Sequence, residues 1–172
     1  MLWIKTFFGI LFQTSLLGFF LYLPALTINW PEASLFLSIH FSITILASCY
    51  LLIFKPSSIE ARMNYDSEAQ PQEDKLATAL MFSAIILGLS LAPIDIFHLK
   101  LSPVFEVLTK NIGLVIYILG MLLVMASMNA NEFAETTVNI QEERGQKVID
   151  TGVYSLVRHP MYTGFIFFIT GV

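Results

Sequence analysis

Residues 33–54 of this chain read ASLFLSIHFSITILASCYLLIF and contain no Asp, Glu, Lys or Arg. A helix needs about 20 mainly apolar residues to cross the hydrocarbon core of a bilayer, so this stretch predicts a transmembrane helix. Three further stretches of the same character carry no internal Lys or Arg, at roughly Phe7 to Ile28, Leu76 to Phe97 and Asn111 to Met128. The sequence therefore predicts an all-α polytopic membrane bundle, with four full transmembrane helices and the start of a fifth over residues 160–172.

The composition supports a lipid environment. Hydrophobic residues make up 56% of the 172 residues and charged residues 13%, and the mean hydropathy is +0.72, outside the range of an ordinary soluble domain. The net charge of −4, with only nine Lys and Arg, gives no basic surface for nucleic acid. The single cysteine, Cys49, excludes a disulfide framework and a cysteine metal site. The apolar segment up to Ile28 is too long for a signal peptide and lacks a small-x-small cleavage site, so we expect a retained anchor.

We expect one membrane domain, residues 1–172, made of five consecutive parts. A helical hairpin over 1–54 turns at Asn29-Trp30-Pro31-Glu32, because Asn and Pro end one helix and start the next. A polar loop follows over 55–75, then the third and fourth helices over 76–128, with Pro93 expected to kink or terminate the third. A polar segment over 129–159 leads into the last helix start.

Lys and Arg are unevenly divided between the two ends of the predicted bundle. One end carries Lys5, Lys55, Arg62, Lys75, Arg144, Lys147 and Arg158, and the other carries Lys100 and Lys110. Cytoplasmic loops retain Lys and Arg, so the first end and the N-terminus should be cytoplasmic. The segments 55–75 and 129–159 should then face soluble cofactors.

The chemistry-bearing segment lies at 139–164, where the chain is first polar and then apolar. Gly152 suits a turn, and Pro160 suits the first position of a helix, which makes His159 the expected N-cap. A helix N-terminus presents free backbone N–H groups and a partial positive charge, and Arg158 adds a full one. The expected ligand group is an anion such as a carboxylate or a phosphate.

Two phenols, Tyr154 and Tyr162, flank this helix start together with the His159 imidazole. They can hold an amphipathic cofactor by stacking and hydrogen bonding. The same residue types are also the usual interfacial anchors, with Arg snorkelling and Tyr in the aromatic belt. From these residues alone, we favour the anchor interpretation.

A resemblance to a known family favours the cofactor-binding interpretation instead. Gly152-Val153-Tyr154, followed by Val157-Arg158-His159-Pro160-Met161-Tyr162-Thr163-Gly164, resembles the signature of the isoprenylcysteine carboxyl methyltransferase family and its bacterial relatives, which overlaps with phospholipid methyltransferases. Pro56-Ser57-Ser58-Ile59-Glu60-Ala61-Arg62 and Asn131-Glu132-Phe133 also resemble the bacterial members. The resemblance covers most of the chain and implies a methyltransferase of a prokaryotic inner membrane.

The resemblance also implies S-adenosyl-L-methionine as cofactor and a lipid-linked or hydrophobic methyl acceptor within the bilayer. The Gly-x-Tyr tyrosine and the His-Pro-x-Tyr residues match cofactor contacts, and a short strand-like stretch would line the nucleoside. The implied cofactor contacts are Gln141, Gln146, Lys147, Val148, Ile149, Tyr154, His159, Pro160, Met161 and Tyr162. No catalytic residue is implied, and Arg158 is a candidate for an electrostatic role.

The sequence departs from the family at its end. Family members continue through a helical hairpin to an Arg and a Glu-Glu pair, whereas this sequence stops at Val172, so we expect a site without one wall, in a fragment or a natural truncation. The functions left open are methyl transfer to a carboxylate or another nucleophile, methylation of a phospholipid amine, and a non-catalytic remnant. A membrane reductase is a weaker alternative, because sterol reductases carry a similar Arg-His-Pro-x-Tyr.

Other polar residues have structural interpretations. For His40 we favour a neutral imidazole bonded to a neighbouring helix over a functional intramembrane group. Asp95 should be solvated or cap the loop after the third helix. The carboxylates from Glu60 to Asp74 have no metal-ligand spacing, and we expect no metal. The oligomeric state and the acceptor are not encoded in any pattern of this sequence.

Overall fold

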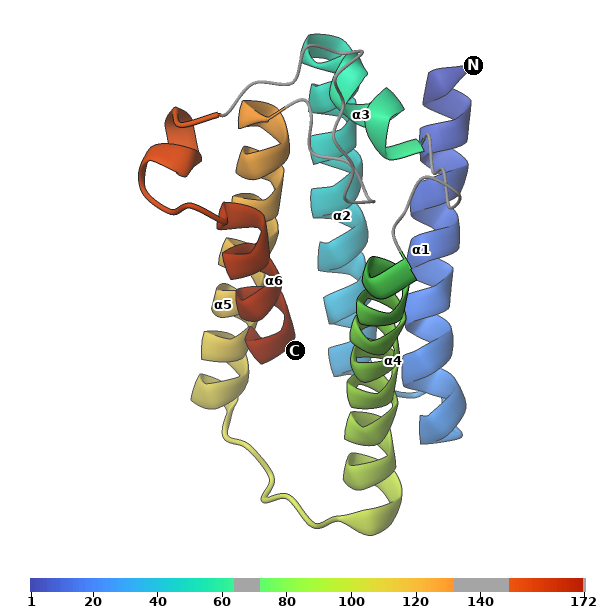
Figure 1. Cartoon of the computed structure of the whole chain (residues 1–172). Coiled ribbons are helices and arrows are strands. Elements are labelled where there is room, and N and C mark those ends of the chain that lie inside the picture. The colour runs from blue at the N-terminus through green and yellow to red at the C-terminus, as the bar shows by residue number, and fades with distance from the viewer. Residues whose placement is uncertain (64–71, 132–148, 172) are drawn as a thin grey trace.

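The computed structural model describes residues 1–63, 72–131 and 149–171 (Figure 1). Within these ranges the regular elements are all helical. In chain order they are α1 (Leu2–Ala25), α2 (Pro31–Phe54), α3 (Pro56–Met63), α4 (Gln72–Ile94), the π-helical turn η1 (Asp95–Leu99), α5 (Val107–Ala130), the 3-10 turn η3 (Gly152–Ser155) and α6 (Pro160–Gly171). The prediction of an all-α polytopic membrane bundle is confirmed.

The spans are close to the predicted ones but mostly longer. Among the described residues, four helical stretches are long and apolar enough to cross a membrane: Leu2–Ala25, Pro31–Phe54, Thr78–Leu99 and Val107–Ala130. A helix of 24 residues is about 36 Å long and exceeds a hydrocarbon core of about 30 Å, so its ends reach the interfaces. Lys5 precedes the apolar run in the sequence but lies inside α1. It can do so because a lysine near a helix end can extend its charge toward water.

The first two spans, α1 and α2, follow each other through a short turn and pack against each other. α1 ends at Ala25, and the next residue, Leu26, adopts a left-handed conformation with a φ of 54°. α2 begins at Pro31, directly after its N-cap Trp30, as the fixed φ of proline favours at a first helical position. The Trp30 ring packs edge-to-face against Phe97, with ring centroids 5.2 Å apart, and so ties the turn to the end of the third span.

The segment expected as a loop over 55–75 is partly helical. It contains the eight-residue helix α3, and α4 already begins at Gln72. Pro56 opens α3, where the missing proline N–H costs nothing, and Ser58, Ile59 and Ala61 of α3 are buried. The polar composition of the whole segment concealed this short helix and its inward-facing residues.

The third span continues past Pro93. The α-helical geometry ends one residue later, at Ile94, and η1 continues it as a π-helical turn, so the proline changes the geometry of the helix rather than stopping it. Asp95 caps the loop that follows, as predicted: its carboxylate accepts hydrogen bonds from the backbone N–H groups of Leu101 at 2.8 Å and Ser102 at 3.1 Å.

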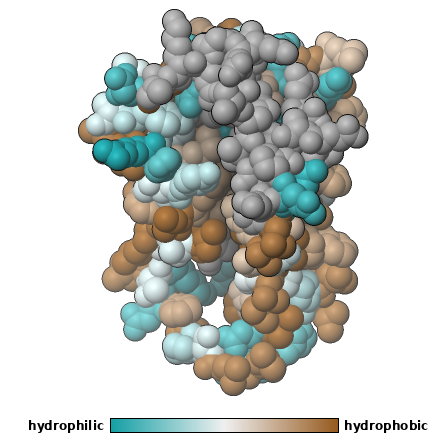
Figure 2. All heavy atoms as spheres, in the orientation of Figure 1, coloured by the Kyte–Doolittle hydropathy of each residue, from teal (hydrophilic) through white to brown (hydrophobic). Residues whose placement is uncertain are grey.

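The helices pack as two groups. α1 packs against both α2 and α4, around the buried residues Leu21, Ala33 and Leu89. α5 packs most extensively against α6. A second buried cluster joins the groups through α2, α3 and α5; its members are Leu51, Leu52, Ile59 and Met128. Hydrophobic side chains prevail across the middle of the face in Figure 2, as expected for a surface in contact with lipid.

One end of the bundle carries most of the described basic residues, and we call it the basic end. The N-terminus, α3, the end of α5, η3 and the start of α6 lie there (Figure 1), with Lys5, Lys55, Arg62 and Arg158 on these elements or directly beside them. Lys110 lies at the other end, where it forms an exposed ion pair with Glu32 at 2.9 Å.

Glycines allow α5 and α6 to approach closely. A Cβ atom built on Gly120 would lie 2.7 Å from the carbonyl oxygen of Gly164, and one on Gly171 would lie 2.6 Å from the carbonyl oxygen of Gly113. Real Cβ atoms essentially never approach other atoms so closely, so Gly120 and Gly171 have to be glycine. Such close contacts are typical of small residues between membrane helices. This one fixes the position of α6, whose first turn carries the His-Pro-x-Tyr motif.

Candidate functional site

The His-Pro-x-Tyr motif forms the first turn of α6. The backbone N–H of Thr163 donates to the carbonyl oxygen of His159 at 3.1 Å, and the Thr163 hydroxyl donates to the same oxygen at 3.2 Å. Pro160 follows as the first residue of α6 and is buried. His159 therefore occupies the N-cap position, as the sequence predicted.

Two aromatic rings lie exposed beside this helix start. The His159 and Tyr162 rings have centroids 5.7 Å apart and planes inclined by 32°, and both side chains are exposed. Arg158 is exposed as well. The start of α6 therefore presents two aromatic faces, and the residue before His159 is an exposed cation; such groups suit a ligand with both an aromatic and an anionic part.

Tyr154 of the Gly-x-Tyr motif lies in η3, next to the end of α5. Gly152 begins this turn with a φ of +60°, a conformation that side-chain-bearing residues rarely adopt. The turn is closed by the Tyr154 backbone N–H, which donates to the carbonyl oxygen of Thr151 at 3.2 Å. The Asn131 side-chain amide then donates to the Tyr154 hydroxyl at 3.4 Å. The last residue of the α5 region thus helps to orient η3.

Met161 turns inward from the same helical turn and meets Arg62 of α3. The Arg62 Nη2 atom lies 3.2 Å from the Met161 sulfur, and Met161 also packs against the cluster of Leu51 and Met128. Burial lowers the pKa of the Arg62 guanidinium, and nearby Tyr154 opposes that shift. Arginine nevertheless stays charged at neutral pH. The site therefore has a partly buried positive charge directly behind the motif.

Sequence reasoning missed this role of Arg62. It assigned Arg62 to the basic end and to the part of the chain that resembles bacterial family members, without a contact to the motif. Arg62 and Met161 are 99 positions apart in the sequence, and a pattern in one sequence cannot show that they meet. The available signal was a basic residue next to the apolar residues Ile59 and Ala61, both of which are buried.

The structure brings together only part of the implied cofactor site. His159 and Tyr162 share the exposed face, whereas Tyr154, Pro160 and Met161 lie toward the interior, with Tyr154 and Met161 both near Arg62. Ile149 is half-buried and precedes η3. The remaining implied contacts fall outside the described residues, as does most of the strand-like stretch: Gln141, Gln146, Lys147 and Val148.

Metal-ligating residue types do not gather anywhere in the part of the chain that the structure describes: within 1–63, 72–131 and 149–171, no three His, Cys, Asp or Glu side chains are placed to hold an ion. The described site is instead built from aromatic rings, backbone N–H groups and guanidinium groups. Such groups suit the binding of an organic anion.

Residues 108–172 match the family model described as phospholipid methyltransferase. This segment is similar to phospholipid methyltransferases. The family belongs to the same group as the isoprenylcysteine carboxyl methyltransferases, so the resemblance noted in the sequence is confirmed at that level. No curated protein and no solved structure matches the chain.

The matched segment coincides with one group of helices. Its range comprises nearly all of α5 together with η3 and α6, so the motif and the close α5–α6 contact both fall inside it. Helices α1 to α4 precede it. The match and the four apolar spans together support an integral membrane methyltransferase.

Proposed function

We propose that this protein uses S-adenosylmethionine to methylate a nucleophile on a lipid-linked or other hydrophobic acceptor, at the cytoplasmic face of a prokaryotic inner membrane. The observation that carries the proposal is the start of α6, within the segment that matches the family model, where the exposed His159 and Tyr162 rings lie beside a helix N-terminus. The excess of Lys and Arg at that end favours the cytoplasmic orientation.

The groups at the start of α6 fit such a cofactor. The backbone N–H groups of Met161 and Tyr162 lie in the first turn and have no acceptor within the helix, so they can donate to a carboxylate. The His159 and Tyr162 rings can stack on an adenine. Arg62 lies behind Met161, where its charge adds to the positive potential that favours an anion. We extend the proposal to Gln141, Gln146, Lys147, Val148 and Ile149 by resemblance.

Methyl transfer requires little from the protein beyond positioning. When bound, S-adenosylmethionine supplies a methyl group whose bond to sulfur breaks as the acceptor's lone pair forms the new bond, leaving a neutral thioether. The protein has to hold both partners in line and exclude water. A carboxylate or thiolate acceptor reacts as the anion, whereas an amine must first lose its proton to a base.

The first test is cofactor binding by the purified full chain in detergent, measured by isothermal titration calorimetry. We expect His159→Ala and Tyr162→Ala each to abolish detectable binding of S-adenosylmethionine while membrane insertion stays intact. His98→Ala is the matched control, because His98 lies in η1 at the other end of the third span. Unchanged binding in both motif variants would remove these residues from the site, and no binding by the wild type would contradict the proposal.

A second candidate function is methylation of a phospholipid amine, which the description of the matching family favours. It is separated from carboxylate methylation by the acceptor. The wild-type chain would be incubated with methyl-labelled S-adenosylmethionine and either phosphatidylethanolamine or a prenylated cysteine. Label in the phospholipid alone supports the amine, and label in the prenylated cysteine supports a carboxyl acceptor.

A further inference from the structure

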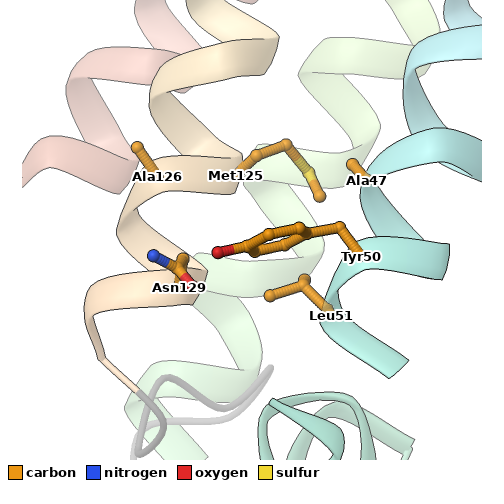
Figure 3. A pocket seen from close by; sticks show the side chains of 6 residues that line it. All are labelled: Ala47, Tyr50, Leu51, Met125, Ala126 and Asn129. Atoms are coloured by element: carbon orange, nitrogen blue, oxygen red, sulfur yellow. The ribbon is translucent and has the colours of Figure 1, made fainter. Parts of the chain in front are cut away.

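Several polar side chains in the spans are paired by their own helix or turn toward a neighbouring one. The Ser38 hydroxyl donates to the Ser34 carbonyl oxygen, and the Ser42 hydroxyl donates to the Ser38 carbonyl oxygen, both at 2.7 Å. Tyr50 and Asn129 line a cavity of about 230 Å³ between α2 and α5, and Figure 3 shows the Tyr50 hydroxyl pointing toward Asn129. A surrounding without water favours such arrangements, because lipid chains offer no hydrogen bonds.

The side chain of Gln13 has no such arrangement. Gln13 lies halfway along the 24 residues of α1, and its side chain is exposed. Among the residues that the structure describes, no hydrogen-bond partner of the Gln13 carboxamide is found. Lys5 is the nearest charged residue of α1 and lies eight positions earlier, which corresponds to about 12 Å along the helix. A glutamine side chain is too short to reach the interface over this distance, so the carboxamide lies in the hydrocarbon.

A carboxamide in hydrocarbon requires hydrogen-bond partners. Leaving it unpaired is unfavourable, because neither water nor the lipid chains can replace the hydrogen bonds that it makes in water. It has two N–H donors and an oxygen with two lone pairs. The backbone groups around Gln13 already bond to each other within α1, so they cannot satisfy all of these. The missing partners therefore have to come from outside the chain.

The face of α1 that carries Gln13 is left open by the packing of the chain itself. α1 packs against α2 and α4. Its buried residues are Thr6, Ile10, Gly18, Leu21 and Ala25. Gly9 lies one turn before Gln13, and a Cβ atom on it would meet nothing within 4 Å. Leu16, one turn after Gln13, is 42% exposed. A polar residue with a small one beside it is the usual composition of a contact between two membrane helices.

From this arrangement we propose that two copies of the chain associate in the membrane through α1, with reciprocal hydrogen bonds between their Gln13 carboxamides. Two copies inserted in the same orientation hold Gln13 at the same depth, and a two-fold axis along the membrane normal brings identical faces together. A carboxamide is both donor and acceptor, so it complements a second copy of itself. Gly9 allows the two helices to approach closely one turn away.

The test is association of the purified full chain in liposomes of dioleoyl phosphatidylcholine. A Cys49→Ser, Leu156→Cys chain carries a donor or an acceptor dye at an 84% exposed position of the basic end, far from Gln13. We expect energy transfer that falls along a monomer–dimer curve as the protein-to-lipid ratio is lowered. Transfer no greater than that of randomly placed monomers would overturn the proposal. No cofactor or acceptor is added, so the result is independent of the proposed methyl transfer.

Gln13→Leu should raise the dissociation constant of the dimer about tenfold or more, because both hydrogen bonds of the pair are lost. The monomer should still fold, since the change places an apolar side chain on a lipid-facing surface. Gln13→Asn keeps a donor and an acceptor and should retain part of the affinity. Ser15→Leu, the matched exchange at another exposed position of α1, should have no effect. An unchanged dissociation constant for Gln13→Leu would overturn the proposal.

Cross-linking of single cysteines identifies the face of α1 that is in contact. Leu16 lies about 60° around the helix from Gln13, and Phe19 lies about 120° from it; these side chains are 42% and 52% exposed. In the Cys49→Ser background, oxidation with copper phenanthroline should join two copies through Leu16→Cys but not through Phe19→Cys. Equal yields at the two positions, or a higher yield at Phe19→Cys, would exclude the Gln13 pair.

Discussion

The Nδ1 atom of His40 lies 2.5 Å from the hydroxyl oxygen of Tyr117, in a contact that joins α2 to α5 inside the membrane. Both side chains are fully buried, and the rings of Phe36 and Phe168 pack against them. The expectation that His40 bonds to a neighbouring helix is confirmed. The pair links the first group of helices to the segment that matches the family model, because Tyr117 lies within the matched range.

This pair should contribute to stability as a unit. Tyr117→Phe leaves the His40 nitrogen without its partner, and His40→Leu leaves the Tyr117 hydroxyl without one, so each change should destabilise the protein. Hydrogen bonds between membrane helices contribute about 0.5–2 kcal/mol, and we expect a coupling free energy in this range from the double-mutant cycle. The measurement is reversible unfolding in mixed micelles. Strictly additive effects of the two substitutions would show that the contact contributes nothing.

The glycine pairs between α5 and α6 predict a second stability effect. Gly120→Ala brings a Cβ atom against the Gly164 carbonyl oxygen and against Phe167, which forces α6 away from α5. Such overpacking typically costs about 1–3 kcal/mol, and the midpoint of thermal unfolding should fall accordingly. Because α6 carries the motif, binding of S-adenosylmethionine should weaken too.

Gly9 and Gly88 supply the matched controls for the glycine prediction. They lie in α1 and α4, and a Cβ atom on either would meet nothing within 4 Å. Alanine has the higher helix propensity by about 1 kcal/mol, so Gly9→Ala and Gly88→Ala should be neutral or slightly stabilising. If Gly120→Ala behaves like these two, the close approach of α5 and α6 is not required for the fold.

The architecture could be predicted from the sequence, because a helix that lies in lipid is made almost entirely of apolar residues. Four apolar runs without internal Lys or Arg, such as 33–54, and a turn with Asn29 and Pro31, sufficed to predict the spans and the hairpin. The start of α6 could also be predicted from neighbouring residues, because Pro160 fixes the backbone at the first helical position and His159, directly before it, is then the N-cap. These features depend on neighbours in the chain.

What the sequence did not yield depends on residues that are distant in the chain. The helix α3 lies in a polar segment, and only its tertiary packing explains the burial of Ser58 and Ile59. The approach of Arg62 to Met161 and the cavity beside Asn129 both require the mutual arrangement of helices, which hydropathy does not encode. That Gln141 and Lys147 contact the cofactor stays a prediction, because both residues fall outside the described residues.

Arg62 should act as a positioning residue for the motif. Its guanidinium contacts the Met161 sulfur, so Arg62→Ala removes a charge and a packing partner behind the first turn of α6. We expect the affinity for S-adenosylmethionine to fall about fivefold or more, corresponding to roughly 1 kcal/mol. Arg62→Lys should restore part of the loss, because it restores the charge, and Lys55→Ala, an exposed change at the same end, should have no effect. Calorimetry that finds equal affinities for Arg62→Ala and the wild type would exclude this role.

The orientation in the membrane can be tested with single cysteines. In a Cys49→Ser background, Leu156→Cys lies between η3 and the start of α6 and Leu101→Cys lies after η1, at positions where the leucines are 84% and 80% exposed. A membrane-impermeant maleimide applied to intact cells should label Leu101→Cys, and the same reagent applied to inside-out vesicles should label Leu156→Cys. The reason is the excess of Lys and Arg at the end that carries His159, which is retained in the cytoplasm. Labelling of Leu156→Cys in intact cells would place the motif outside, where a cytosolic methyl donor cannot reach it, and the proposed reaction would then be excluded whatever the affinity for S-adenosylmethionine measured in detergent.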